Sequence, residues 1–429
     1  MKTSIFKYYN GSKSILIKNL KNFCIIEVDK NFLNLDKQET IITNENLKKL
    51  NSLDFFETIN QNEEILDFVI VTNTDCNLKC SYCYESGIKK YEKININDEQ
   101  IFNFIQYNIS KYPSKNVSVE FTGGEPINNF EYIYKLVNLL KINFPDRKFK
   151  YSIITNGTLI EKEHLNFFDL NNFSMQLSLD GSKKFHNNER KGKDFFNTYD
   201  LILNNIKLIL REFSSINLSV RINVSNKNSD SIINLIEELN NAIIPVYRSK
   251  FFLYFDFVDV PQKDVNYIVE NEKYDLLMKL YFSLYKSGFE LSGEYVIGGN
   301  CMIKNNNSVT ILPNGDLIKC YSLVDNENYV ENKLSENCKI DIADINPLVT
   351  ICNNYGCSMY YLCKGGCPYK EYVKIGSLNK YCNPKLIEMV NKILFVFKLN
   401  NYGLLSKNID SIDDLIEEYN NVQIHKICF

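Results

Sequence analysis

The feature that most constrains this chain is a loop with three cysteines directly after an apolar segment. The apolar segment predicts a strand over Ile65–Asn73, and Cys76, Cys80 and Cys83 follow with three and then two residues between them. Three thiolates in one short loop can hold three irons of a cubane iron–sulfur cluster. Since such a cluster has four irons, the fourth iron is left open for a small molecule.

A zinc knuckle and a chance grouping of three unrelated core cysteines are the alternatives for this loop. A structural zinc site takes four ligands, usually in CxxC pairs, and the sequence offers no fourth ligand close to the loop. A spacing of three and then two residues directly after an apolar strand is also uncommon by chance. The ligand arithmetic therefore favours the cluster.

The 13 cysteines of the 429-residue chain are unevenly distributed. Three lie in the loop and eight between 301 and 382, while Cys24 and Cys428 have no partner pattern. The N-terminus lacks the apolar run of a signal peptide, so we expect a cytoplasmic protein with metal or cluster ligands rather than disulfides. No apolar run is long enough to span a bilayer, and a net charge of −3 gives no reason to expect a nucleic-acid partner.

Between residues 65 and 290 the pattern alternates regularly between strand and helix, which predicts a parallel sheet with outer helices. Six units suit an open partial barrel, in which the chemistry lies at the carboxyl ends of the strands. The predicted strands are Ile65–Asn73, Val117–Thr122, Lys150–Thr155, Phe173–Leu179, Asn217–Val224 and Phe251–Val258. The predicted helices are Asn97–Tyr112, Phe130–Asn143, Lys162–Phe168, Phe196–Phe213, Ser229–Asn240 and Glu272–Ser287.

Three further motifs fall at strand ends. Thr122-Gly123-Gly124-Glu125-Pro126 follows the second strand, Thr155-Asn156-Gly157 follows the third, and Ser178-Leu179-Asp180-Gly181 follows the fourth, with Arg190 further on. Glycines allow a backbone to approach a ligand closely, and a guanidinium pairs well with a carboxylate. The alternatives are a glycine turn with a solvated glutamate, and a surface ion pair of Arg190 with Glu189 or Asp194.

The region from Cys301 onward is rich in cysteine. Cys301 and Cys320 flank a predicted hairpin whose turn is Pro313–Asp316. Further cysteines follow at Cys352, Cys357, Cys363, Cys367 and Cys382. A pair of zinc sites is the alternative to iron–sulfur clusters in this region.

Taken together, these motifs resemble the radical S-adenosylmethionine (SAM) enzymes. Cys76, Cys80 and Cys83, with Tyr82 before the last cysteine, are similar to the CxxxCxφC motif of that family. The resemblance implies a [4Fe–4S] cluster on the three cysteines and SAM on its open iron. The residues that it implies for SAM binding are Tyr82, Gly123, Gly124, Glu125, Asn156, Ser178 and Arg190.

The C-terminal cysteines resemble the SPASM module, which holds two auxiliary [4Fe–4S] clusters. The resemblance implies an outer cluster on Cys352, Cys357, Cys363 and Cys382, and an inner cluster on Cys301, Cys320 and Cys367. The usual CxxC pair is interrupted here, since Asn354 stands where a cysteine is expected. The inner cluster then takes its fourth ligand from Cys338, or keeps an open iron for a substrate thiolate.

The whole chain is therefore expected to contain a small α/β cap (1–62), a partial (β/α)6 radical SAM barrel of the TIM type (63–290), a SPASM module (291–384) and C-terminal helices (385–429). The cap is a possible leader-peptide recognition element, and it includes a predicted helix over Asn44–Phe56.

The resemblance implies an oxidoreductase whose 5′-deoxyadenosyl radical removes hydrogen from a ribosomal precursor peptide with a leader and installs a crosslink, with a cysteine thioether favoured. The expected electron donor is a flavodoxin or ferredoxin. An alternative is a sulfatase-maturating enzyme that forms formylglycine, but such enzymes have aspartate directly after the cysteine that matches Cys320, and here that residue is Tyr321. A non-catalytic zinc-bound peptide scaffold is a third possibility.

Overall fold

The computed structural model describes residues 65–86, 88, 98–248, 250–261, 264–291, 301–335, 339–350, 352, 357, 359–401, 403, 405 and 407–422. It also describes the backbone of a few short strands near the two ends of the chain. The predicted helix over Asn44–Phe56 lies outside the described residues. None of the described helices is long and apolar enough to cross a membrane.

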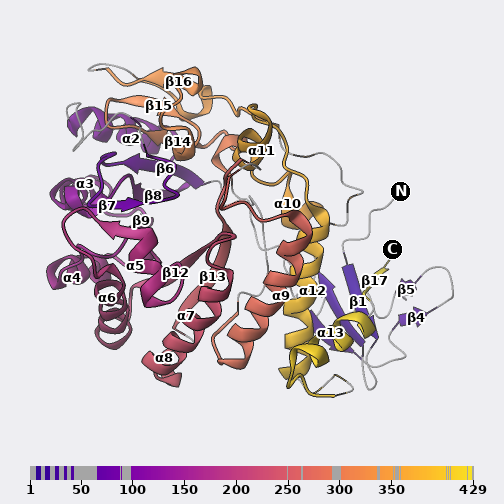
Figure 1. The fold of residues 1–429 in the computed structure, drawn as a ribbon. Coiled ribbons are helices and arrows are strands. Elements are labelled where there is room, and N and C mark those ends of the chain that lie inside the picture. The colour runs from indigo at the N-terminus through magenta and orange to yellow at the C-terminus, as the bar shows by residue number, and fades with distance from the viewer. Residues whose placement is uncertain are drawn as a thin grey trace.

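Six parallel strands form the central sheet, in the order β13-β12-β10-β9-β8-β6 (Figure 1). Every neighbouring pair is parallel, as the alternating sequence pattern predicts. The strands are β6 (Ile65–Val71), β8 (Asn116–Thr122), β9 (Phe149–Ile154), β10 (Ser174–Ser178), β12 (Asn217–Val224) and β13 (Phe251–Phe257). The prediction of an α/β fold built on a parallel sheet is thus confirmed, with strand bounds within about two residues.

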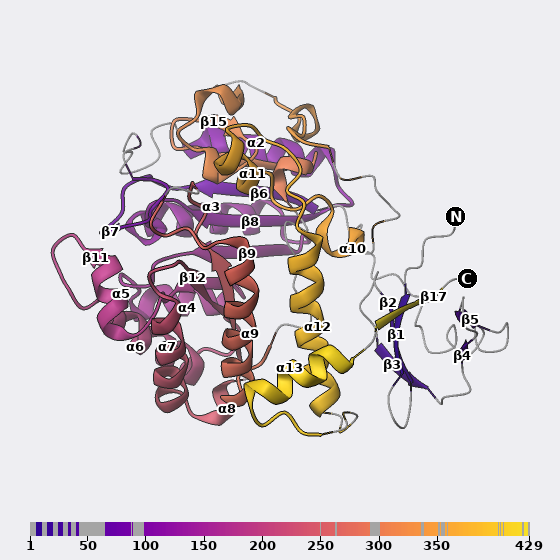
Figure 2. The ribbon, with the colours of Figure 1, turned by 45° about the vertical axis from the view of Figure 1, so that its right-hand side comes forward.

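Helices connect these strands and cover the outside of the sheet (Figures 1 and 2). The main ones are α2 (Asp98–Lys111), α3 (Phe130–Asn143), α4 (Lys162–Leu170), α6 (Thr198–Glu212), α7 (Ser229–Ala242) and α9 (Glu270–Lys286). Shorter elements are η2 (Pro126–Asn129), α5 (Lys183–Glu189) and α8 (Pro245–Arg248), and two short strands, β7 (Leu78–Cys80) and β11 (Arg190–Gly192), pair with each other.

The alternation within each strand separates the core from the functional face. On β8, Val117, Val119 and Phe121 are fully buried beneath the helices. Glu120 and Thr122, which alternate with them, face the other side and line a cavity. Burying such apolar side chains contributes about 1.5–3 kcal/mol each, so the outer face stabilises the sheet and leaves the inner face free to carry polar groups.

The first C-terminal hairpin extends the central sheet beyond β6. Strand β14 (Ser308–Ile311) pairs in parallel with β6, and antiparallel β15 (Asp316–Ile318) and β16 (Val330–Lys333) follow. The predicted hairpin is therefore present, with Gly315 in its turn at a φ of 85°. The region from Cys301 shares the sheet of the parallel strands, and the predicted boundaries at residues 62, 290 and 384 stay predictions.

The rest of the C-terminal region is mostly helical. It contains η3 (Met302–Lys304), η4 (Tyr321–Leu323), η5 (Glu327–Tyr329), η6 (Ile342–Asp344), α10 (Tyr360–Cys363), α11 (Pro368–Ile375), α12 (Pro384–Asn401) and α13 (Ile412–Asn421). Helix α12 lies along α9, and Tyr285 on α9 stacks on Phe397 with ring centroids 4.2 Å apart.

The two ends of the chain meet in a small antiparallel sheet beside α12 and α13 (Figures 1 and 2). Its order is β17-β1-β2-β3. The strands are β1 (Phe6–Asn10), β2 (Ile15–Asn19), β3 (Ile25–Val28) and β17 (Ile424–Ile427), and a separate hairpin joins β4 (Leu33–Leu35) to β5 (Thr40–Ile42). The sequence did not predict β1 or the closing strand β17.

Candidate functional site

A large cavity of about 1150 Å³ lies at the carboxyl ends of the parallel strands. The three cysteines of the first loop line it, together with all but one of the residues predicted to bind SAM: Tyr82, Gly123, Gly124, Asn156, Ser178 and Arg190. Cys301, Cys320 and Cys367 line the same cavity from the C-terminal region. The fold thus brings together residues from the two cysteine-rich regions, which lie far apart in sequence.

The cysteine loop is held by a two-stranded ladder that the sequence did not predict. Strand β7 (Leu78–Cys80) pairs antiparallel with β11 (Arg190–Gly192). Just beyond β11, the Lys193 backbone N–H donates to the Asn77 carbonyl at 2.8 Å, and the Lys193 ammonium pairs with Asp75 at 2.7 Å. The loop is therefore anchored to the segment that carries Arg190, which fixes the position of both.

A buried polar network surrounds Arg190. Its Nη1 donates to the Tyr82 hydroxyl at 2.7 Å and to Asp180 Oδ2 at 3.2 Å, and the Tyr82 hydroxyl also donates to Asp180. The backbone N–H and side-chain amide of Asn223 donate to Asp180 Oδ1 at 2.9 and 3.0 Å. Asp180 is fully buried, so the network neutralises a carboxylate that would otherwise be costly to bury.

Arg190 is only 8% exposed, and the alternative of a surface ion pair with Glu189 or Asp194 is therefore wrong. Its partner Asp180 lies in the Ser-Leu-Asp-Gly motif, but no role was predicted for it. The Arg190 Nε is buried and has no hydrogen-bond partner among the described residues. An N–H donor of this kind beside the cysteine loop fits a bound carboxylate.

The glycine motif approaches protein backbone closely. A Cβ on Gly124 would lie 2.1 Å from the Asp75 carbonyl oxygen, and one on Gly123, at a φ of 142°, would lie 2.2 Å from the Asn73 carbonyl oxygen. Glu125 is fully buried, does not line the cavity, and accepts hydrogen bonds from Thr155 Oγ1 at 2.6 Å and from two backbone N–H groups. The Glu125 carboxylate thus lies among the strand ends and is separated from the cavity by the residues that line it.

Asn156 connects the third strand end to the cysteine loop. Its Nδ2 donates to Asn77 Oδ1 at 2.8 Å and lies 3.7 Å from the Cys76 sulfur. The Leu78 backbone N–H also donates to the Cys76 sulfur, at 3.4 Å. Hydrogen bonds to ligating sulfurs are typical of iron–sulfur sites, and these two are already in place.

The donor set of the loop fits a cluster. Burial raises the pKa of the Cys76 thiol to about 12 and also raises the pKa of Cys80, so thiolates there need the positive charge that bound metal supplies. Among the described residues, no three His, Cys, Asp or Glu side chains are close enough to hold a single metal ion. A cubane needs a different arrangement, because each thiolate binds a different iron.

The C-terminal cysteines occupy two neighbouring places. Cys301, Cys320 and Cys367 interact with one another at the cavity wall. Away from the cavity, Cys363 interacts with Cys382, and the Cys352 backbone N–H donates to the Lys364 carbonyl at 3.4 Å. These groups match the predicted inner and outer ligand sets, which stay predictions. Cys357 packs against the core, and Cys338 lies outside the described residues.

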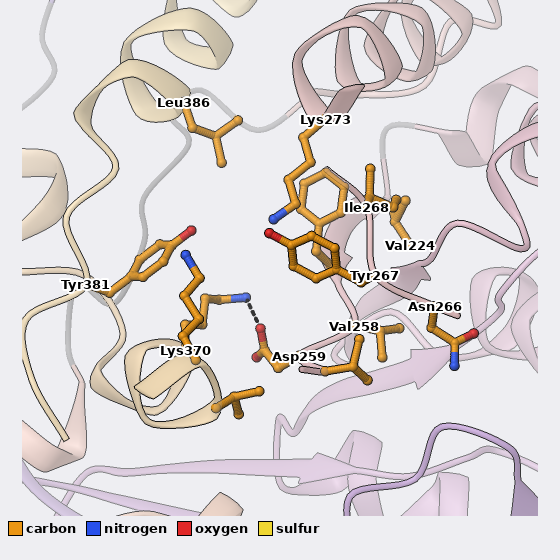
Figure 3. A pocket seen from close by; sticks show the side chains of 14 residues that line it. Val224, Val258, Asp259, Asn266, Tyr267, Ile268, Lys273, Lys370, Tyr381 and Leu386 are labelled. Carbon is orange, nitrogen blue, oxygen red and sulfur yellow. Dashed lines mark hydrogen bonds and ion pairs between the residues drawn. The ribbon is translucent and has the colours of Figure 1, made fainter. Parts of the chain in front are cut away.

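Charged residues join α11 to the last parallel strand at the edge of the cavity. Lys370 pairs with Asp256 at 3.0 Å and with Asp259 at 3.1 Å, and Arg221 pairs with Asp256 at 2.8 Å. Figure 3 shows Lys370 and Asp259 around a smaller neighbouring cavity of about 40 Å³, with Tyr381 beside them. The sequence did not predict this contact, which ties the segment after Cys367 to the barrel.

Among the carboxylates that line the cavity, Glu120 lies next to Asp67. Glu120, on the inner face of β8, accepts a hydrogen bond from Ser152 Oγ at 3.3 Å. Burial and the nearby Asp67 carboxylate raise the pKa of Glu120 to about 7. The same group faces Tyr321, the residue after Cys320. A carboxyl with such a pKa in a cavity is a candidate functional group.

Comparisons with known proteins agree with this architecture. The model of the radical SAM superfamily matches residues 70–239. The cysteine-type anaerobic sulfatase-maturating enzyme of Clostridium perfringens (strain ATCC 13124) is 24% identical over 378 residues, which is 75% of this chain and 97% of that enzyme.

Two solved structures share the fold. The structure of anSMEcpe with bound AdoMet has a TM-score of 0.62 at 19% identity and covers 83% of this chain and 98% of its own. The structure of Streptococcus suis SuiB bound to its precursor peptide SuiA has a TM-score of 0.50 at 16% identity. It covers 90% of this chain and 98% of its own. Residues 70–239 are therefore a radical SAM domain, and the chain is a radical SAM enzyme related to the anaerobic sulfatase-maturating enzymes.

Proposed function

We propose that this chain is a radical SAM enzyme that modifies a ribosomally made peptide and installs a crosslink, a thioether from a cysteine sulfur to a peptide carbon. The observation that carries the proposal is the shared cavity of about 1150 Å³, which the first cysteine loop and the inner C-terminal cysteines line together. A peptide segment in this cavity would lie between the place where hydrogen is removed and the place where sulfur is held.

The residues fit the cofactors of the family. Cys76, Cys80 and Cys83 would hold the [4Fe–4S] cluster, and SAM would lie against the predicted residues that line the cavity, with Arg190 as the donor to its carboxylate. When bound, cluster and SAM supply a 5′-deoxyadenosyl radical that removes a hydrogen atom. The chain itself contributes the fixed position of the loop and a walled cavity that limits access of water.

The C-terminal cysteines would hold two auxiliary clusters, which supply an electron acceptor when bound. Joining carbon to sulfur removes two hydrogens in all, from one C–H and one S–H bond. One leaves as a hydrogen atom, and the other as a proton and an electron. Glu120, with a pKa raised to about 7 by burial, lines the cavity and would accept that proton.

Peptide substrates are supported by the relatives. SuiB is described in complex with its precursor peptide SuiA, and anSMEcpe in complex with a cysteine-containing peptide. We therefore propose a precursor peptide as the partner of this chain, with a flavodoxin or ferredoxin as the electron donor.

A second candidate is formylglycine formation, as in anaerobic sulfatase maturation. The relative of that name matches over 97% of its own length, which favours this activity. The residue after Cys320 weighs against it, because Tyr321 stands where the resemblance implies an aspartate.

The experiment that separates these activities uses the anaerobically reconstituted enzyme, SAM, dithionite and cysteine-containing peptides. One peptide carries a sulfatase motif, and the others come from short reading frames beside this gene. A thioether product loses two hydrogen atoms and no longer reacts with thiol reagents, whereas formylglycine is an aldehyde that reacts with hydrazides. Formation of an aldehyde would favour formylglycine formation over the thioether crosslink. A colourless protein that does not cleave SAM would contradict both activities.

A further inference from the structure

A buried lysine lies between the two groups of C-terminal cysteines. Lys304 ends the short helix η3, three residues after Cys301, and is 5% exposed. Its ammonium donates to the carbonyl oxygen of Gly366 at 2.7 Å and to that of Lys364 at 3.1 Å. Both acceptors belong to the short segment that separates Cys363 from Cys367, so a single side chain connects the Cys301 turn to this segment.

The segment that accepts these hydrogen bonds has an unusual backbone. Lys364, Gly365 and Gly366 have φ angles of 48°, 96° and 66°. Lys364 adopts a left-handed conformation that residues with a Cβ seldom populate. Such a conformation persists where the surroundings hold it, and here the ammonium of Lys304 binds the carbonyls on both sides of Gly365.

Further contacts attach the same segment to other cysteine-bearing parts of the chain. The Gly365 carbonyl accepts a hydrogen bond from the backbone N–H of Tyr381, the residue before Cys382, at 3.0 Å. The Cys352 backbone N–H donates to the Lys364 carbonyl. A Cβ on Gly366 would lie 2.1 Å from the Tyr381 carbonyl oxygen. The segment is therefore packed closely where the predicted inner and outer ligand sets meet.

The charge of Lys304 reaches both ligand sets. It interacts with Cys301 and Cys367, which line the cavity, and with Cys363, which belongs to the other group. A positive charge favours the more negative, reduced form of a nearby cluster, and charge near a cluster is one of the factors that set its reduction potential.

We propose that Lys304 is a positioning residue for the two auxiliary iron–sulfur sites. It holds the segment between Cys363 and Cys367 so that these cysteines serve different clusters, and its charge raises the reduction potential of the clusters that they bind. The inference rests on the proposed function, because it needs the auxiliary clusters. Electrons released by substrate oxidation would then be accepted more readily next to the cavity.

The test compares reduction potentials of the anaerobically reconstituted full chain by titration followed with electron paramagnetic resonance. Lys304→Gln keeps a donor but removes the charge, and Lys304→Met removes both. We expect the auxiliary signals of both variants to shift to lower potential, and the methionine variant also to lose iron. Lys304→Arg keeps the charge and is expected to restore the wild-type potential.

Lys319 provides a matched control. It is fully buried, and its ammonium donates to the carbonyls of Asn305 at 2.8 Å and Ser308 at 2.7 Å. Although it precedes Cys320 in sequence, the charged group that acts on it is Glu331. Lys319→Met is expected to lower the unfolding temperature while shifting the auxiliary potentials less than Lys304→Met.

The outcomes distinguish this inference from the proposed function. Wild-type protein that carries only the cluster of the first loop would contradict the auxiliary sites themselves. Wild-type protein with auxiliary clusters whose potentials are unchanged in both Lys304→Gln and Lys304→Met would overturn the role of Lys304 alone. A lower auxiliary potential in Lys304→Gln, together with the wild-type potential in Lys304→Arg and an unchanged iron content in both, would establish the charge effect separately from folding.

Discussion

The two cysteine-rich regions of this chain are built by different means. The first loop keeps its three cysteines within eight residues and is fixed by a backbone ladder and a buried ion-pair network. The second spreads its cysteines from 301 to 382 and depends on short turns, left-handed residues and the buried Lys304. The cysteines of the first region all come from one chain segment, whereas those of the second come from at least four. We expect the first to form a site more independently of the rest of the chain.

The strongest test of this difference removes one cysteine from each region. Cys80→Ala takes a ligand from the first loop and is expected to abolish cleavage of SAM to 5′-deoxyadenosine. Cys320→Ala alters the inner C-terminal set, so we expect SAM cleavage to persist while the modified peptide is lost. Chromatography of 5′-deoxyadenosine and mass spectrometry of the peptide measure the two effects.

The iron content of the same variants provides the control. If three clusters are present, each variant should lose about one third of its iron. If Cys320→Ala abolished SAM cleavage as completely as Cys80→Ala, the two regions could not be separated in the way that the structure suggests.

The next largest effect concerns the network that anchors the first loop. Asp180→Asn keeps the shape of the side chain but removes the charge that pairs with Arg190, and it leaves a buried guanidinium without its counter-ion. Removing one partner of a buried ion pair lowers the free energy of unfolding by about 3–5 kcal/mol. We expect the free energy of unfolding to fall by about 3 kcal/mol, because the amide still accepts hydrogen bonds from Asn223.

An exposed ion pair serves as the control for Asp180. Lys162 and Glu212 are 2.9 Å apart on the surface, and surface pairs contribute little. Glu212→Gln should leave the unfolding transition almost unchanged. An equally small effect of Asp180→Asn would show that the ladder between β7 and β11 alone holds the loop.

The sequence predicted the first region better than the second for physical reasons. Periodicity and strand-end motifs depend on neighbouring residues, so the six parallel strands and the residues around Cys76, Asn156 and Arg190 were found. The β7–β11 ladder was missed because each strand has only three residues. Glu125 was expected to serve SAM binding, but its carboxylate turns toward Thr155, a choice that depends on tertiary packing.

Buried and half-buried charged residues were the main omission in both regions. Asp180, Lys304 and Lys370 look like ordinary surface residues in the sequence, and their partners lie between 10 and 114 positions away. Periodicity does not report such pairs. One local signal for such a pair is a charged residue at a position that the strand or turn pattern predicts to be buried. Asp180, just after β10, shows this signal.

The smallest expected effect belongs to Glu120, which lies in the cavity between the two regions. Its pKa in the folded protein is about 7, raised from 4.5 by burial and by Asp67. Between these values the folded state binds more protons than the unfolded state, so the stability of the wild-type protein falls as pH rises through this window. The carboxylate is partly open to the cavity, and solvent there screens its interactions. We therefore expect the free energy of unfolding to fall by about 1–2 kcal/mol across this pH window.

Glu120→Gln removes this titration. The free energy of unfolding of the variant minus that of the wild-type protein should therefore increase from pH 5 to pH 8. Glu163→Gln, at an exposed position on α4, controls for the loss of one negative charge. The same variant tests the proposed role in catalysis, because an enzyme that passes a proton to Glu120 should lose turnover at the peptide step while SAM cleavage continues. A pH-independent stability difference would mean that the cavity hydrates Glu120 fully, and the carboxylate would then have no raised pKa to link the chemistry of the first cysteine loop to that of the second.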